Sequence, residues 1–96
     1  MLEKKLTIVN KLGMHARAAT CLVQLCEEFD EEITLLRDDV QADARSILEL
    51  LMLEAPCGTE VTLRVSGSDE ESEAEVVESI EKLFQQGFYE NKPISS

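Results

Sequence analysis

The chain has 96 residues, enough for one domain with a single modest hydrophobic core. Its 20 acidic and 9 basic residues give a formal net charge of −11, which repels nucleic acids and anionic membranes, so we expect neither as a partner. The first ten residues contain no long apolar run. We therefore expect no signal peptide and no membrane insertion, and a cytoplasmic protein.

The three cysteines and the single histidine do not form a metal-binding pattern. Cys21, Cys26 and Cys57 contain no C-x-x-C spacing, so we expect no metal site and no cofactor. A five-residue separation turns Cys21 and Cys26 away from each other on a helix, which argues against a disulfide between them. We interpret all three as small thiols in a reducing compartment.

The first third of the chain predicts a strand, a loop and a helix. Residues 2–9 alternate between apolar and polar side chains, which is typical of a strand with one wet face. Residues 10–13 break this pattern and predict a loop. From residue 16 to about residue 29 the apolar residues follow helical spacing. These are Ala19, Leu22, Val23, Cys26 and Phe29.

Two strands joined by a tight turn are expected next. Residues 33–36 alternate as a second strand. Asp38-Asp39 is a plausible hairpin turn into a short third strand over residues 40–44. The third strand has the weakest pattern of the four that we predict.

A short, unusually apolar helix follows. Ser46 and Glu49 have the spacing of a capping box and predict a helix over residues 47–53. Six of these seven residues are apolar, too many for one buried stripe. Such a helix is either fully buried or presents part of its surface to a partner, and the sequence alone leaves both alternatives open.

The last third predicts a strand, a long helix and a tail. Residues 60–66 alternate cleanly, with Val61, Leu63 and Val65 facing inward. Ser68 and Glu71 have the spacing of a second capping box, and the helix that follows is expected to stop before Gly87. We expect one domain over residues 1–88 and a loosely ordered tail over residues 89–96.

The order β-α-β-β-α-β-α predicts an α+β fold. We expect an open-faced two-layer sandwich, with three helices on one face of a four-stranded, mainly antiparallel sheet. The other face of the sheet is expected to be open to water. It would carry Lys5, Thr7, Thr34, Thr62 and Arg64.

The only histidine lies at the expected start of the first helix. A helix N-terminus has unsatisfied N–H groups and partial positive charge, so it can bind an anion. A ring nitrogen of His15 could attack a phosphoryl group there, and Arg17 could donate charge-assisted hydrogen bonds to the phosphate. The alternative is that His15 only caps the helix.

These features together resemble the HPr family, the histidine phosphocarriers of the phosphoenolpyruvate-dependent phosphotransferase system. The resemblance rests on Gly13, the residues 15–17, Ser46 opening a hydrophobic helix, and the element order. It covers about residues 4–84. Residues 11–17 and 50–53 look closest to the nitrogen-branch, or NPr, type.

The resemblance implies a function for the opening motif. His15 would accept a phosphoryl group on Nδ1 from Enzyme I and pass it to a histidine of an Enzyme IIA-type acceptor, while Arg17 stabilises the phosphate. The backbone at Ala16, Arg17 and Ala18 would bind the phosphate. The family usually has proline where this chain has Ala18, so we expect a somewhat less rigid but competent loop.

The resemblance also implies a regulatory residue and a docking surface. Ser46 matches the position that an HPr serine kinase/phosphorylase modifies in some bacteria; the alternative is that Ser46 is only a helix cap. The surface that docks onto Enzyme I would contain Met14, Thr20, Ile47, Leu48 and Leu51. Thr20 could equally be an ordinary polar position on the first helix.

Three functional hypotheses follow. The first is a phosphocarrier for sugar transport or nitrogen-branch regulation, acting as a monomer and turning over no substrate by itself. The second is a regulatory interaction module of the same fold, in which phosphorylation of His15 or Ser46 controls partner docking. The third is a small acylphosphatase-like hydrolase, which we disfavour because the motif has no second polar catalytic group near it.

Overall fold

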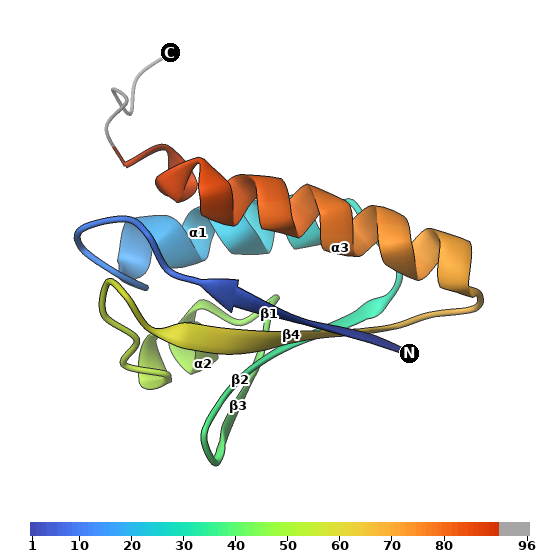
Figure 1. Ribbon diagram of the computed structural model, residues 1–96, viewed down its shortest axis with the longest axis horizontal. Helices are drawn as coiled ribbons and strands as arrows, with labels where there is room; N and C mark the ends of the chain where they lie inside the picture. Colours follow the sequence, from blue (N-terminus) through green and yellow to red (C-terminus); the bar gives the residue numbers. More distant parts are fainter. Residues whose placement is uncertain (91–96) are drawn as a thin grey trace.

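The structure is a computed structural model that describes residues 1–90. It contains a four-stranded sheet, three α-helices and a short 3₁₀ turn (Figure 1). Their bounds are β1 Leu2–Thr7, α1 Ala16–Cys26, β2 Glu32–Arg37, β3 Val40–Asp43, α2 Ile47–Met52, β4 Glu60–Ser66, α3 Glu70–Gln85 and the 3₁₀ turn Gly87–Tyr89.

The sheet has the strand order β1-β4-β2-β3, and all its neighbours are antiparallel. Strand β4 pairs with both β1 and β2, so its alternating side chains form the centre of the sheet. Arg37 pairs with Val40 across the predicted Asp38-Asp39 hairpin turn, where Asp38 has a φ of 52°. A two-residue turn of this kind suits the twist of the strands, and the predicted hairpin is confirmed.

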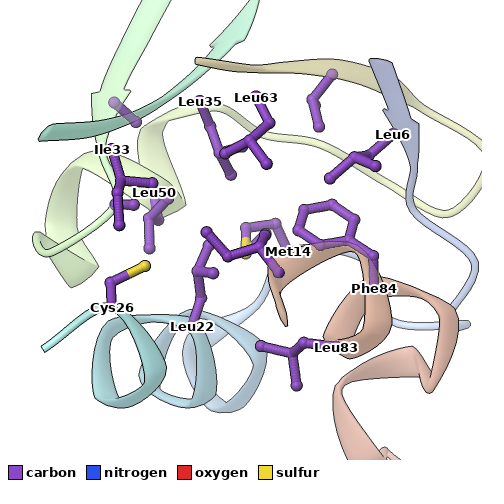
Figure 2. Close-up of a cluster of buried hydrophobic side chains, with 14 of the residues drawn as sticks. Leu6, Met14, Leu22, Cys26, Ile33, Leu35, Leu50, Leu63, Leu83 and Phe84 are labelled. Atoms are coloured by element: carbon purple, nitrogen blue, oxygen red, sulfur yellow. The ribbon is translucent and has the colours of Figure 1, made fainter. Parts of the chain in front are cut away.

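The helices cover one face of the sheet and enclose a single core. Helices α1 and α3 lie beside each other across that face (Figure 1), and α2 packs against α1 and β3. Figure 2 shows Leu22 of α1, Leu50 of α2 and Leu63 of β4 directed into the same cluster. Burial raises the pKa of the Cys26 thiol to about 12, so Cys26 packs as a neutral apolar side chain. The predicted α+β sandwich is confirmed.

The opposite face of the sheet is polar, as predicted. Lys5 and Thr7 are exposed there, and Thr34 and Thr62 are half-buried. Arg64 Nε lies 2.7 Å from Glu3 Oε2 across the β1–β4 pair. Cross-strand pairs of opposite charge stabilise such an exposed face modestly.

Two elements end earlier than the sequence pattern indicates. Strand β1 ends at Thr7 instead of residue 9, although Ile8 still donates to the Thr59 carbonyl at 2.9 Å. Helix α1 ends at Cys26 instead of residue 29, because the Phe29 amide donates to the Cys26 carbonyl in a tighter turn. The apolar periodicity continues past both ends because these residues still pack on the core.

The start of α3 differs from the predicted capping box. The N-cap is Asp69 rather than Ser68, and its carboxylate accepts from the Ser72 amide at 2.8 Å. A carboxylate at this position also complements the positive end of the helix dipole. The prediction of a Ser68–Glu71 box is therefore wrong by one residue. The helix stops before Gly87, which has a φ of 63° and ends the helix as predicted.

The described chain makes contacts with the rest of the fold up to residue 90, two residues past the end that we expected for the domain. Phe88 is 1% exposed and its ring centroid lies 4.8 Å from that of Phe84. Tyr89 and Glu90, which we expected in a loose tail, contact the loop before α1 and the start of that helix. The rest of the predicted tail, residues 91–96, lies outside the described residues.

Candidate functional site

His15 is the N-cap of α1. Its backbone is extended, with φ −104° and ψ −179°, and its carbonyl accepts from the Ala19 amide at 2.8 Å. Its Nδ1 accepts a hydrogen bond from the Arg17 amide at 3.3 Å. Nδ1 is therefore unprotonated, its lone pair directed at the helix terminus, and the hydrogen of the neutral ring is on Nε2. The capping role of His15 and an unprotonated Nδ1 are thus compatible.

The loop before His15 is held by backbone contacts. The Met14 amide donates to the Ala55 carbonyl at 2.8 Å, and Asn10 Nδ2 donates to the Gly13 carbonyl at 2.7 Å. Gly13 has a φ of 71°, and a Cβ there would lie 2.5 Å from the Ala55 carbonyl oxygen and 2.8 Å from Pro56 Cα. Only glycine fits this close approach. The loop therefore gives His15 a defined position.

Arg17 lies beside His15 and is partly exposed. Its Nη2 donates to the Tyr89 carbonyl at 3.2 Å, so the C-terminal 3₁₀ turn positions the guanidinium near the start of α1. Ala18 is fully buried under the same turn of the helix, whereas Ala16 is exposed. Burial of Ala18 fixes the first helical turn on the core without a proline.

Glu90 joins this site and was not predicted from the sequence. Its Oε1 accepts from Asn10 Nδ2 at 2.9 Å and from the Leu12 amide at 3.1 Å, and its Oε2 accepts from the Lys11 amide at 3.0 Å. Oε1 also lies 3.7 Å from His15 Nε2. The hydrogen bond from Asn10 is the main reason that the pKa of the Glu90 carboxyl lies below its ordinary value. No sequence signal pointed to Glu90 because it lies beyond the last helical pattern.

Ser46 is the N-cap of α2, as predicted. Its Oγ accepts from the Glu49 amide at 3.2 Å. The Glu49 carboxylate accepts from the Asp43 amide at 2.9 Å instead of returning to Ser46, so only half of the predicted capping box forms. The Arg45 guanidinium donates to the Phe29 carbonyl at 2.5 Å.

Helix α2 presents part of its apolar surface to solvent. Leu48 is 70% exposed, Met52 61% and Ile47 39%, while Leu50 is fully buried. Of the two alternatives for this helix, partial exposure is the one observed. Leu12 in the loop before His15 is also 67% exposed, and that loop contacts the segment just after α2 through the Met14–Ala55 hydrogen bond.

The predicted docking residues are only partly on this surface. Ile47 and Leu48 are exposed and Leu51 is half-buried. Thr20 is half-buried and donates to the Ala16 carbonyl at 2.8 Å. Met14 is only 5% exposed and points into the core (Figure 2). Its side chain therefore offers little contact area, and a docking role for Met14 stays a prediction. Leu12 and Met52 are exposed apolar residues of the same region that the sequence analysis did not single out.

The described part of the chain shows neither a metal cluster nor a spanning helix. Within residues 1–90, no three His, Cys, Asp or Glu side chains are grouped so that they could hold a metal ion. Over the same residues, every helix is too short or too polar to cross a membrane.

Comparison with known protein families decides the family. Residues 2–86 match the family described as "PTS HPr component phosphorylation site". The chain belongs to the HPr family. This confirms the resemblance drawn from the motif around His15 and from the element order.

Named HPr-family phosphocarriers resemble most of this chain. The phosphocarrier protein NPr of Shewanella violacea is 47% identical over 76 residues, which are 79% of this chain and 84% of that protein. The phosphocarrier protein HPr of Treponema pallidum is 39% identical over 94% of this chain and 99% of its own length. The crystal structure of HPr-C-His from Thermoanaerobacter tengcongensis matches with a TM-score of 0.83 and 33% identity, covering 94% of this chain and 98% of the other.

Proposed function

We propose that this chain carries a phosphoryl group on Nδ1 of His15. It takes the group from phosphorylated Enzyme I and delivers it to a histidine of an Enzyme IIA-type acceptor. The single observation that carries this proposal is the geometry of His15, whose Nδ1 lone pair points at the amide of Arg17 at 3.3 Å. The same nitrogen that caps the helix in the free protein is the one that can attack phosphorus.

The helix start supplies what a phosphoryl group needs. Once a phosphoryl group is on Nδ1, its oxygens take the place of the ring nitrogen at the first amides of α1, at Ala16, Arg17 and Ala18. Arg17 adds a second source of positive charge from the adjacent turn. Phosphoryl transfer depends mainly on such positioning and charge stabilisation, so a small exposed site is sufficient.

The exposed apolar surface supports docking of both partners. We assign the docking surface to Leu12, Thr20, Ile47, Leu48, Leu51 and Met52. This set keeps four of the five predicted residues, leaves out the buried Met14 and adds the exposed Leu12 and Met52. An acidic chain with a small apolar patch suits partners that offer basic groups around an apolar contact. We further infer a cytoplasmic monomer, since the carrier must leave one partner before it meets the next.

The test uses purified Enzyme I and ³²P-labelled phosphoenolpyruvate. We expect acid-labile, alkali-stable label on the wild-type protein and none on H15A. The control K82A, on the outer surface of α3, should take label like the wild type. Absence of label on the wild type with an Enzyme I that labels another HPr would refute phosphoryl carriage.

We also propose Ser46 as a second, regulatory phosphorylation site. Ser46 is half-buried at the start of α2, and its neighbours Ile47 and Leu48 are exposed, so a kinase can reach it. A phosphate there would sit at the positive end of α2 and add about two negative charges beside the docking surface. Beside the exposed Ile47 and Leu48, these charges would have to lose water when a partner docks, which would weaken the apolar contact.

The serine proposal is tested with an HPr serine kinase and ATP. We expect an acid-stable phosphate on the wild type and on S68A, a control serine in the loop before α3, and none on S46A. Equal labelling of S46A would leave Ser46 as a helix cap alone.

A further inference from the structure

The last described residue, Glu90, contacts the loop before His15. The Glu90 carboxylate accepts three hydrogen bonds, from Asn10 Nδ2, the Lys11 amide and the Leu12 amide, at 2.9 to 3.1 Å. Its side chain is only 11% exposed. Two consecutive backbone amides and an amide side chain form a concave anion site, and the chain fills this site with its own carboxylate.

The same carboxylate faces the far edge of the His15 ring. Its Oε1 lies 3.7 Å from Nε2, slightly beyond hydrogen-bond length and within the range of a charge contact. Since Nδ1 accepts from the Arg17 amide, the ring hydrogen is on Nε2 and points to the Glu90 side of the ring. The imidazole thus lies between the Arg17 amide, which donates to Nδ1, and the Glu90 carboxylate, which faces Nε2.

The turn that carries Glu90 is anchored in the core. Phe88 is 1% exposed and packs on Phe84, with ring centroids 4.8 Å apart. The next residue, Tyr89, accepts from the Arg17 guanidinium at 3.2 Å. One short segment therefore sets the position of both His15 and Arg17.

We propose that Glu90 is a positioning residue of the phosphoryl-transfer site. It holds the loop of residues 10–13 in place and keeps the ring hydrogen of His15 on Nε2, so that Nδ1 presents its lone pair to phosphorus. This inference rests on the proposed phosphocarrier function and adds to it a residue from the C-terminal end of the described chain.

The transfer step places charge where Glu90 can neutralise it. The Nδ1 lone pair of His15 forms the new P–N bond while the P–N bond of the donor histidine breaks, and that electron pair returns to the donor nitrogen. Nε2 keeps its hydrogen throughout, so the His15 ring becomes a phosphorylated imidazolium with a positive charge. Glu90 stabilises this charge from the ring edge opposite the phosphate. The arrangement resembles in principle the orientation of a catalytic histidine by a buried carboxylate.

The first experiment reads the ring directly and needs no phosphorylation. ¹⁵N NMR of the full chain at alkaline pH reports which nitrogen of neutral His15 carries the hydrogen. We expect the Nε2–H tautomer in the wild type and in E78Q, a control on the exposed side of α3. We expect a mixture of both tautomers in E90Q, because the glutamine amide can donate to Nε2. E90D should restore the wild-type form in part.

The second experiment measures the rate of phosphoryl transfer from Enzyme I. We expect E90Q to be about tenfold slower than wild type, E90D intermediate, and E78Q unchanged. Circular dichroism confirms that the compared variants are folded. An E90Q protein with the wild-type tautomer and a rate within twofold of wild type would overturn the proposal. If the wild type takes no label from Enzyme I, the phosphocarrier proposal fails, while the tautomer comparison still decides the role of Glu90.

Discussion

At the scale of single residues, the site depends on backbone geometry as much as on side chains. His15 caps α1 with Nδ1, and Gly13 permits the close approach of the preceding loop to Ala55 and Pro56. These residues are neighbours in sequence, so the motif could be found without a structure. The Glu90 contact could not, because no local pattern joins a residue beyond the last helix to a loop before the first.

Gly13→Ala tests the close approach of the loop. The new methyl group would meet the Ala55 carbonyl and Pro56 Cα, so we expect the free energy of unfolding to fall by about 2 kcal/mol more than in the control. The control is Gly58→Ala, since Gly58 also has a positive φ but a Cβ there meets nothing within 4 Å. Urea unfolding of both variants gives the comparison. Equal losses would show that positive φ alone, and not the contact, requires glycine at position 13.

Arg17→Lys tests the guanidinium. Lysine keeps the positive charge but loses the planar array of donors that can bind the phosphate and the Tyr89 carbonyl together. We expect transfer from Enzyme I to slow by about tenfold, with thermal stability within about 0.5 kcal/mol of wild type. Steady-state kinetics separate a change in kcat from a change in KM. A rate equal to that of wild type would show that charge alone is sufficient.

At the scale of elements, α2 differs most from an ordinary amphipathic helix. It buries Leu50 and leaves Leu48 and Met52 mostly exposed, although all three are good apolar core residues. A helix of six residues has little stability of its own, so the Ser46 cap and the buried Leu50 hold it in place. The exposed side chains contribute little to folding and remain available for contacts with a partner.

Leu48→Ala separates the contribution of this helix to folding from its contribution to partner binding. Because Leu48 is 70% exposed, we expect the free energy of unfolding to change by less than about 0.5 kcal/mol. Binding to Enzyme I, measured by calorimetry, should weaken by about 1–2 kcal/mol if Leu48 anchors the contact. The matched control is Val40→Ala at the β2–β3 hairpin, where an exposed apolar side chain lies on a different element. Equal affinities of the two variants would place the docking surface elsewhere.

At the scale of the whole molecule, an ion pair joins the first residue to the start of α3. The Glu73 carboxylate is 2% exposed, lies 3.1 Å from the Met1 ammonium and accepts from the Gly67 amide at 2.7 Å. The Gly67 hydrogen bond is the main reason that the pKa of Glu73 lies below its ordinary value of 4.5. Strand β1, at one edge of the sheet, is thereby tied to the longest helix.

Glu73→Gln tests the Met1–Glu73 ion pair through the pH dependence of thermal stability. A lowered folded-state pKa stabilises the fold above pH 4.5, and this contribution is lost as the pH falls through the folded-state value. We therefore expect the Tm of E73Q to be lower than that of wild type at pH 7 and the difference to shrink below pH 4. Differential scanning calorimetry across this range gives the result. A difference that does not change with pH would assign the loss to packing instead of charge.

The arrangement of helices and strands was predictable from the sequence wherever the apolar pattern of a segment matches the face that it buries in the core. The alternation in β4 and the Asp38-Asp39 turn predicted the central strand and the hairpin correctly. The end of α1 was displaced because a residue that continues the apolar pattern can pack from a tight turn as well as from a helix. The cap of α3 was displaced because Ser68 and Asp69 are both good N-cap residues, and the sequence does not choose between them. The contacts of Tyr89 and Glu90 follow from the burial of Phe88, a tertiary contact that periodicity does not reveal.

Because His15 caps α1, the proposed phosphoryl group and the stability of the fold depend on the same nitrogen. A phosphoryl group on Nδ1 replaces the hydrogen bond that this nitrogen accepts from the Arg17 amide. The free energy of unfolding and the free energy of phosphoryl transfer are therefore linked. Any stabilisation that the phosphate gives to the folded chain must lower its transfer potential by the same amount. A cap of moderate strength is therefore advantageous, because a phosphate held too well at the helix terminus would no longer be passed on.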